Sequence, residues 1–174
     1  AHKSWFFFEN EFVCLGSGIH SEQPLPVATT LNQSYLDGEV SYTSRRKSKK
    51  ISAGSHRLRK VKWIYHDSVA YIFPERNSVQ LLNDTVSGSW KRINRQHDTS
   101  EDLIIEEVFK LWIDHGVAPQ QASYAYIVLP ASSLEEAKNY YNQVPLTILS
   151  NTTQLQGVRH HQLNISQLCF YEPA

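Results

Sequence analysis

Short apolar or alternating segments recur along the whole chain, and each is broken by Gly, Pro, Asn, Asp or Ser. They are rich in β-branched and aromatic residues, a composition typical of strands. About ten such strands with turn residues between them predict an all-β protein, an antiparallel β-sandwich. The expected strands are residues 12–15, 40–43, 61–65, 69–73 (ending at Pro74), 79–82, 90–93, 124–129, 146–149, 155–158 and 168–171, and residues 1–8 suggest a further strand.

Two segments need separate treatment. Residues 101–113 are so densely apolar that a helix and a buried strand have the same pattern, and we favour a strand. Residues 133–141 predict one short helix, because Ser133 can cap it and Glu135 and Glu136 lie in its positive first turn. No repeat or linker divides the 174 residues, so we expect a single unit over 1–174.

Simple counts exclude several classes of protein. With 41% hydrophobic and 20% charged residues the chain has a globular composition. No apolar run approaches the roughly 18 residues of a membrane span. Methionine is absent even at position 1, which predicts a processed or excised chain. Cys14 and Cys169 could form a disulfide in an oxidising compartment or remain as two buried thiols, and neither has the spacing of a zinc site.

The formal net charge of zero conceals an uneven distribution. Nine of the 17 basic residues lie between positions 45 and 62 with no acidic residue among them, and the other residues carry 8 basic and 17 acidic side chains, a balance of −9. We expect residues 45–62 to form an exposed basic loop. It is either a solvated loop or a binding site for a sulfated or uronate-containing polysaccharide; nucleic acid is less favoured because no Arg/aromatic module accompanies it. The candidate binding residues are Arg45, Arg46, Lys47, Lys49, Lys50, Arg57, Arg59 and Lys60.

Motifs with catalytic residue types do not assemble into a site. His66-Asp67-Ser68 has the residues of a hydrolase triad, but neighbours on a strand point to opposite faces. The same geometry separates His160 from His161. The glutamates at 106–107 and 135–136 are adjacent in sequence and not paired across a cleft, so no glycosidase carboxylate pair is visible. The sequence therefore predicts no catalytic residue, no metal site and no cofactor in this chain.

Aromatic residues are the other candidates for ligand contact. Trp63 and Tyr65 share one face of their expected strand, and Trp5, Trp90 and Trp112 lie in other strands. Exposed aromatic rings can stack on sugar rings, but for each of them core packing is the simpler role.

Several motifs, in this order along the chain, resemble the polysaccharide lyase family of hyaluronate lyase, chondroitin AC and ABC lyases and xanthan lyase. The resemblance extends from Lys3 to about Tyr171 and is carried by 3–8, 13–19, 29–33, 66–71, 88–94, 111–116 and 124–130, among them Lys-Ser-Trp-Phe-Phe-Phe at 3–8 and Gly-Ser-Trp-Lys-Arg-Ile-Asn at 88–94. It implies the later part of a central β supersandwich, galactose-mutarotase-like in fold, and a strand that ends near Gly116. The basic segment 45–62 departs from what the family leads us to expect.

The resemblance also implies what this chain contributes. In the family, an N-terminal α/α toroid supplies the Asn, His, Tyr and Arg of β-elimination, a Glu comes from the early central domain, and a small β-domain follows. None of those motifs is matched here, so no catalytic residue is carried over. The parent would be a secreted or periplasmic lyase acting on acidic polysaccharide, with this portion inactive alone and in contact with the toroid and the C-terminal domain. The alternative is a freestanding carbohydrate-binding or adhesion module; neither nucleic acid nor membrane is an expected partner.

Overall fold

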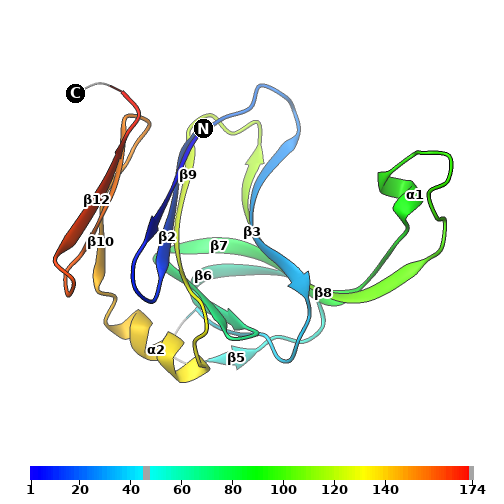
Figure 1. Cartoon of the computed structure of the whole chain (residues 1–174), viewed down its shortest axis with the longest axis horizontal. Coiled ribbons are helices and arrows are strands. Elements are labelled where there is room, and N and C mark those ends of the chain that lie inside the picture. Colours follow the sequence, from blue (N-terminus) through cyan, green and yellow to red (C-terminus); the bar gives the residue numbers. More distant parts are fainter. Residues whose placement is uncertain (45–47, 173–174) are drawn as a thin grey trace.

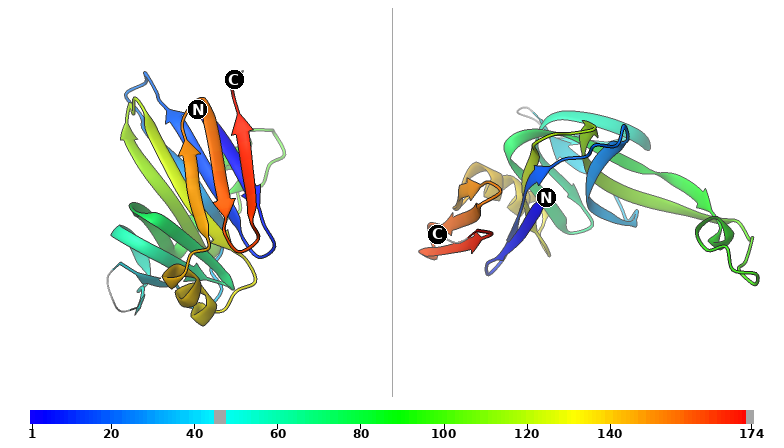
Figure 2. Two further views of the ribbon diagram at one scale, coloured as in Figure 1. Left: turned by 90° about the vertical axis from the view of Figure 1, so that its left-hand side faces the viewer. Right: turned by 90° about the horizontal axis from the view of Figure 1, so that it is seen from above.

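The computed structural model describes residues 1–44 and 48–172, and for residues 76 and 77 it describes the backbone alone. The expected antiparallel sandwich is confirmed: every strand pair is antiparallel, and the strands form a nine-stranded and a three-stranded sheet (Figures 1 and 2). The elements are β1 His2–Phe7, β2 Phe12–Ile19, β3 Pro26–Tyr35, β4 Ser41–Thr43, β5 Lys49–Lys50, β6 Gly54–His66, β7 Val69–Gly88, α1 Trp90–Ile93, β8 Ile104–Val117, β9 Ala122–Leu129, α2 Leu134–Asn142, β10 Leu146–Asn151, β11 Leu155–His160 and β12 Ile165–Phe170.

The large sheet curls because two segments of β7 pair with different neighbouring strands. The first residues of β7, 70–72, pair with β9, whereas residues 80–88 pair with β8. The strand order is β1-β2-β9-β7-β6-β4-β5, and β8 branches from β7 to carry β3. The expectation that a strand ends at Pro74 is wrong: β7 continues through it, because Pro74 lies in the stretch between the two paired segments, where no ladder N–H is needed from it.

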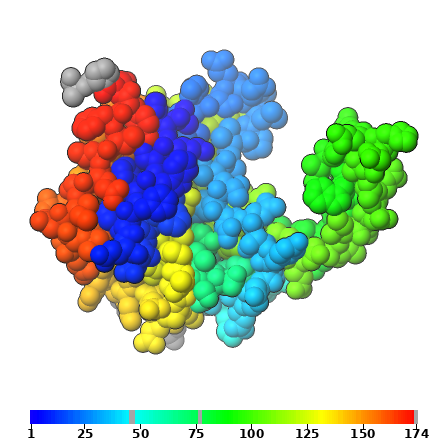
Figure 3. All heavy atoms as spheres, in the orientation of Figure 1, coloured from blue at the N-terminus to red at the C-terminus, as the bar shows by residue number. Residues whose placement is uncertain are grey.

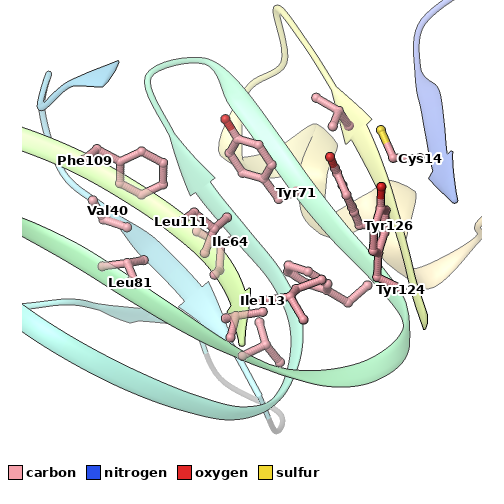
Figure 4. Packing of buried hydrophobic residues seen from close by; sticks show 14 of the residues in the cluster. Cys14, Val40, Ile64, Tyr71, Leu81, Phe109, Leu111, Ile113, Tyr124 and Tyr126 are labelled. Atoms are coloured by element: carbon pink, nitrogen blue, oxygen red, sulfur yellow. The ribbon is translucent and has the colours of Figure 1, made fainter. Parts of the chain in front are cut away.

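Each face of the large sheet carries its own core. One cluster fills the inside of the curl and contains Ile64, Tyr71, Phe109, Leu111 and Tyr126 (Figure 4). The other lies where α2 and the three-stranded sheet cover the opposite face, and it includes Phe6, Leu15, Trp63, Ile127 and Val158. The three-stranded sheet of β10, β11 and β12 lies beside β1 and β2 (Figure 2).

The predicted helix is confirmed with its cap. Ser133 precedes α2, its hydroxyl accepts the Glu136 N–H at 3.2 Å, and the Glu136 carboxylate accepts the Ser133 N–H at 2.6 Å. This reciprocal pair satisfies backbone donors that the first helical turn leaves free. The strand expected in 101–113 is confirmed as β8, which runs on to Val117.

Two further local expectations are wrong. Residues 90–93 form α1, a single helical turn at the tip of the β7–β8 hairpin, in which the Asn94 N–H donates to Trp90 O at 2.8 Å. Four residues, two of them the charged Lys91 and Arg92, are too few for a periodicity that could separate a strand from a helical turn. The expectation of one exposed loop over 45–62 is also wrong for most of its described residues. Those from Gly54 onward pair with β7 as β6, and Lys49 and Lys50 form β5. Neither α1 nor α2 has the length and apolar character of a membrane-crossing helix.

Candidate functional site

The candidate basic residues are spread over more than one strand. Arg45, Arg46 and Lys47 lie outside the described residues. Lys49 and Lys50 are exposed on β5, and Lys50 Nζ lies 2.6 Å from Glu39 Oε1, so part of its charge is already compensated. β4 separates β5 from β6, which carries the other candidates.

On β6 a bulge keeps basic side chains at the surface. Arg57 and Arg59 alternate with half-buried residues and are exposed. Lys60 has a φ of 55° and coincides with a register shift against β7, so that Leu58 and Val61, three positions apart, pack in the same core. Arg57, Arg59 and Lys60 therefore form the basic group that the structure retains on one strand.

Lys62, next along β6, is used differently. It is half-buried, and its Nζ lies 5.1 Å from the centre of the Tyr141 ring on α2. This cation–π contact joins the strand to the helix. Lys62 is therefore part of the packing of α2 and not of the exposed basic group.

The four tryptophans divide into core and surface. Trp63 is 2% exposed, and Trp112 is half-buried beneath Lys110 Nζ, which lies 5.5 Å from its ring centre. Trp5 and Trp90 are 54% and 58% exposed. The packing role expected for each of them holds for Trp63, whereas Trp5 and Trp90 depart from it and are free to meet a ligand or a partner.

Lys3, Trp5 and Phe7 form a stripe on β1, here called the β1 stripe. They alternate with the buried Ser4 and Phe6 on an edge strand of the large sheet. Trp5 pairs with Cys14 and Phe7 with Phe12, so the stripe continues the face that holds the first core, and the Phe7 and Phe12 rings stack at 5.2 Å. A cation beside two exposed aromatic rings suits the charge and the apolar face of an acidic sugar.

The β1 stripe was not predicted as a set, although Trp5 was singled out. The signal that could have found it is the alternation of residues 2–7, which puts positions 3, 5 and 7 on one face once the segment is treated as a strand.

His115 on β8 adds a neutral polar group to this region. Its Nε2 lies 2.8 Å from Thr29 Oγ1 on β3. Burial lowers the pKa of His115, Asp114 opposes that change and the Lys3 ammonium adds to it. The imidazole is therefore a hydrogen-bonding group near neutral pH, and Lys3 supplies the positive charge.

A hollow of about 700 Å³ lies between α2 and the ends of β9 and β11, with Glu9, Asn10, Asn139 and Gln143 at its wall. Its titratable pair is Glu11 and His160, whose side chains are only 4% and 6% exposed. Burial raises the pKa of Glu11, while the facing His160 opposes the rise. Because the pair is closed to solvent, it suits a structural contact better than acid–base chemistry on a substrate.

The remaining histidine motifs are also structural. His66 is buried, stacks on Phe109 with ring centres 4.2 Å apart and accepts the Asp37 N–H at 3.1 Å through Nε2. Asp67 and Ser68 have φ values of 44° and 59° and form the turn of the β6–β7 hairpin, so the three residues do not converge. Among residues 1–44 and 48–172, no three His, Cys, Asp or Glu side chains are grouped to hold a metal ion.

The two cysteines are free thiols. Cys14 is buried on β2, and burial raises its pKa to about 11. Cys169 on β12 is half-buried. Of the two alternatives for the pair, the structure contains the unbridged one.

Comparison with known proteins agrees with this fold. The model of polysaccharide lyase family 8, super-sandwich domain, matches residues 1–141. The chain belongs to polysaccharide lyase family 8. It is 44% identical over 172 residues to chondroitinase-AC of Pedobacter heparinus, a match that covers 98% of this chain and 24% of that protein. It is 30% identical to xanthan lyase of Bacillus sp. strain GL1, over 95% of this chain and 19% of the relative.

Solved structures of this family superpose closely on the chain. Chondroitinase AC lyase, determined in oligosaccharide complexes, matches with a TM-score of 0.87 and 44% identity over 97% of this chain and 25% of that one. Paenibacillus xanthan lyase matches with a TM-score of 0.88 and 28% identity over 98% of this chain and 17% of that one. The chain thus spans about a quarter or less of the length of these relatives, and the part it matches is the super-sandwich domain.

Proposed function

We propose that this chain is a non-catalytic, later part of the super-sandwich of a polysaccharide lyase, and that the parent enzyme cleaves uronate-containing polysaccharide such as chondroitin sulfate or hyaluronan. The observation that carries the non-catalytic role is the burial of the acid–base candidates. Glu11 and His160 are closed to solvent, and His66 is stacked in the core. The parent activity is supported by the names of the relatives, which include chondroitinase-AC and hyaluronate lyase.

In the proposed parent reaction, neutralising the uronate carboxylate acidifies the C5 proton. A base removes this proton, the C4–C5 double bond forms, and the C4–O bond breaks to release the preceding sugar with a proton on its oxygen. The residues for these steps would come from the toroid and the early central domain, which makes both, with the C-terminal β-domain, the partners of this chain. A polysaccharide substrate lies outside the cell, which supports a secreted or periplasmic location.

Within this chain, the groups suited to acidic sugar are the β1 stripe and the basic residues of β6. Trp5 offers an exposed ring to a sugar face and Lys3 a charge to a carboxylate or sulfate. Arg57, Arg59 and Lys60 would act mainly through long-range attraction, which salt weakens. Arg45, Arg46, Lys47, Lys49 and Lys50 remain candidates for the same role.

Two activity measurements test the proposed function. The isolated chain, incubated with chondroitin sulfate and with hyaluronan, should release no product with unsaturated-uronate absorbance, whereas the parent lyase should. Turnover by the isolated chain would overturn the non-catalytic role. Absence of turnover by the parent on every uronate polysaccharide would overturn the proposed substrate class.

A binding measurement tests the contact with sugar. Retention of the isolated chain on immobilised chondroitin sulfate should fall as salt rises, and Lys3→Ala/Trp5→Ala and Arg59→Ala should each reduce it. Arg159→Ala is the matched control, because it removes one exposed positive charge from a different sheet, on β11. Equal loss in Arg59→Ala and Arg159→Ala would mean that net charge alone drives retention.

A freestanding carbohydrate-binding module is the second candidate, and the exposed β1 stripe favours it. It predicts salt-dependent retention of the isolated chain together with a gene that encodes no toroid. A toroid encoded in the same reading frame as these residues would exclude it.

A further inference from the structure

Residues 84–108 form an arm that projects away from the body of the molecule. It consists of the last part of β7, α1 and the first part of β8 (Figures 1 and 3). Pairing of β7 with β6 ends at Asn83 and pairing of β8 with β3 ends at Val108, so beyond these residues the arm is a two-stranded ribbon. An isolated two-stranded ribbon is at best marginally stable in water.

The arm exposes an unusual amount of apolar surface for such a ribbon. Ile93 is 81% exposed, Leu103 60%, and Trp90 and Ile105 58% each. None of the four residues of α1, all of which the structure describes, is buried. Exposed apolar side chains gathered in one place mark a surface that is covered by a partner.

A groove shows which face of the arm is shaped to receive that partner. It measures about 480 Å³ and lies where the end of β3 meets the arm, with Tyr35 from β3 opposite Trp90 from α1. Trp90 and Ile93, three residues apart, both line it, as expected for one side of a helical turn. Val86, Ile104 and Val108 add aliphatic surface, while Gln33, Ser34, Ser89 and Glu106 add polar groups to the wall.

The charge of the arm decides between an acidic sugar and a polypeptide as the occupant. Residues 84–108 contain three Lys or Arg and six Asp or Glu, and one of the six, Glu106, lines the groove. A net negative arm repels a uronate or sulfate polymer. An apolar side chain flanked by a Lys or Arg fits both the groove and the surrounding charge.

We propose that this arm groove docks an apolar segment of the parent lyase from outside these 174 residues, so that the arm is a packing contact within the longer chain. This inference rests on the proposed function, because it requires the longer lyase chain. The matched relatives supply the necessary length: the chain covers 24% of chondroitinase-AC and 19% of xanthan lyase. A covered arm would also give the marginal ribbon the packing that it lacks here.

Cross-linking in the parent lyase tests the proposal. A photoreactive benzoylphenylalanine replaces Ile93 in the groove, and in a matched control it replaces Leu25, which is 59% exposed on the turn before β3. Illumination should give an intramolecular cross-link from position 93 to a peptide outside the 174 residues, at monomer mass and well above the Leu25 control. A covalent dimer, a cross-link to added chondroitin sulfate, or a yield no higher than the control would overturn it.

Hydrogen exchange in the same lyase supplies an independent measurement. Truncating an interfacial tryptophan commonly costs at least 2 kcal/mol of contact energy, which corresponds to about 30-fold in an opening equilibrium. Trp90→Ala and Ile93→Ser should therefore raise amide exchange in the arm about 30-fold while β2 and β9 stay protected. Unchanged exchange in both variants would contradict the docked arm.

These outcomes are separable from a failure of the proposed function. A parent that cleaves uronate polysaccharide but gives no cross-link from position 93 overturns the docking alone. A parent that gives the cross-link but no uronate cleavage supports the docking and overturns the proposed substrate class.

Discussion

His160 Nε2 lies 3.0 Å from Glu11 Oε1, and this almost wholly buried pair joins the three-stranded sheet to the large one. The Leu163 N–H donates to His160 Nδ1 at 3.1 Å, which holds the ring with Nε2 toward the carboxylate. Burial raises the pKa of Glu11, and the facing His160 opposes this rise without cancelling it.

Glu11→Gln should change how stability depends on pH. The pKa of Glu11 is raised in the folded state above the ordinary value of 4.5, so the folded chain holds this proton more tightly than the unfolded chain does. Its contribution to stability is complete below pH 4.5 and is lost as pH rises through the raised pKa. The melting temperature of Glu11→Gln should therefore increase relative to that of the unmodified chain as pH rises from about 4.5 to 7.

The neighbouring Glu9 is exposed and gives a matched control. Glu9→Gln removes a charge from the same turn and leaves the contact between Glu11 and His160 in place. Because the Glu9 charge adds to the rise in the pKa of Glu11, this variant should show a smaller change in the same direction. Parallel melting curves for Glu11→Gln and the unmodified chain across this pH range would contradict the raised pKa.

Gln156→Leu should destabilise the junction of the two sheets. Gln156 is fully buried; its Nε2 donates to Asn151 Oδ1 at 2.9 Å and Ser17 Oγ at 3.2 Å, and its Oε1 accepts from the Tyr171 hydroxyl at 2.9 Å. Leucine fills the volume but leaves buried polar partners unpaired, at a cost of about 2–4 kcal/mol. Urea unfolding measures the loss. Gln154→Leu, at an exposed position two residues earlier, should change stability by less than about 0.5 kcal/mol.

The elements that could be predicted from sequence are those with strong local signals. Residues 133–141 carry a capping box, and the strands around 61–65 and 124–129 are dense in β-branched and aromatic residues. β3 lacked such a signal, because the exposed Ala28, Thr30 and Gln33 and the partly buried residues between them give a strand with little apolar character. Its place is determined by pairing with β8, which no local pattern reveals.

The candidate functional surfaces can likewise be predicted from the sequence only in part. The alternation of side-chain direction along residues 2–7 is enough to predict the β1 stripe, and the basic residues of β6 can be predicted from their charge. Their separation from Lys49 and Lys50 depends on the pairing of β4 with both strands. The contact between Glu11 and His160 joins residues distant in sequence, so only the packing of the sheets brings them together.

Gly16→Ala should destabilise the chain because the Tyr124 ring packs directly on Gly16. A β-carbon at position 16 would lie 2.2 Å from Tyr124 Cε1, and Tyr124 is itself buried beside Tyr126. Moving this ring should cost about 1–3 kcal/mol, as overpacking in cores does. Thermal unfolding compares the stability of Gly16→Ala with that of Gly88→Ala, where the added carbon meets nothing within 4 Å. Equal stability of the two variants would show that the ring moves freely.

Cys14 should be chemically inert in the folded chain. Burial raises its pKa to about 11, so well under 1% of it is thiolate at pH 8. In a Cys169→Ser variant, labelling by iodoacetamide should be at least about 100-fold slower in the native chain than in denaturant. Rapid native labelling of that variant would mean that the β2 region opens readily. In a Cys14→Ser variant, the same assay measures the labelling rate of the half-buried Cys169.

Trp5→Ala and Trp63→Ala should separate binding from stability. Trp63 is 2% exposed, so its removal should cost about 3–5 kcal/mol of unfolding free energy. Trp5 is 54% exposed, so its removal should leave stability within about 1 kcal/mol, yet loss of a stacking ring should weaken chondroitin sulfate binding by up to about tenfold.

Calorimetric titration with chondroitin sulfate oligosaccharides, alongside urea unfolding of each variant, checks this pair. Trp5→Phe is the rescue variant, because it keeps an aromatic face on the β1 stripe while it removes the indole N–H. It should recover most of the lost affinity if stacking is the contact. If Trp5→Ala binds as tightly as the unmodified chain, the β1 stripe is not a sugar surface, and the basic residues of β6 remain the candidates.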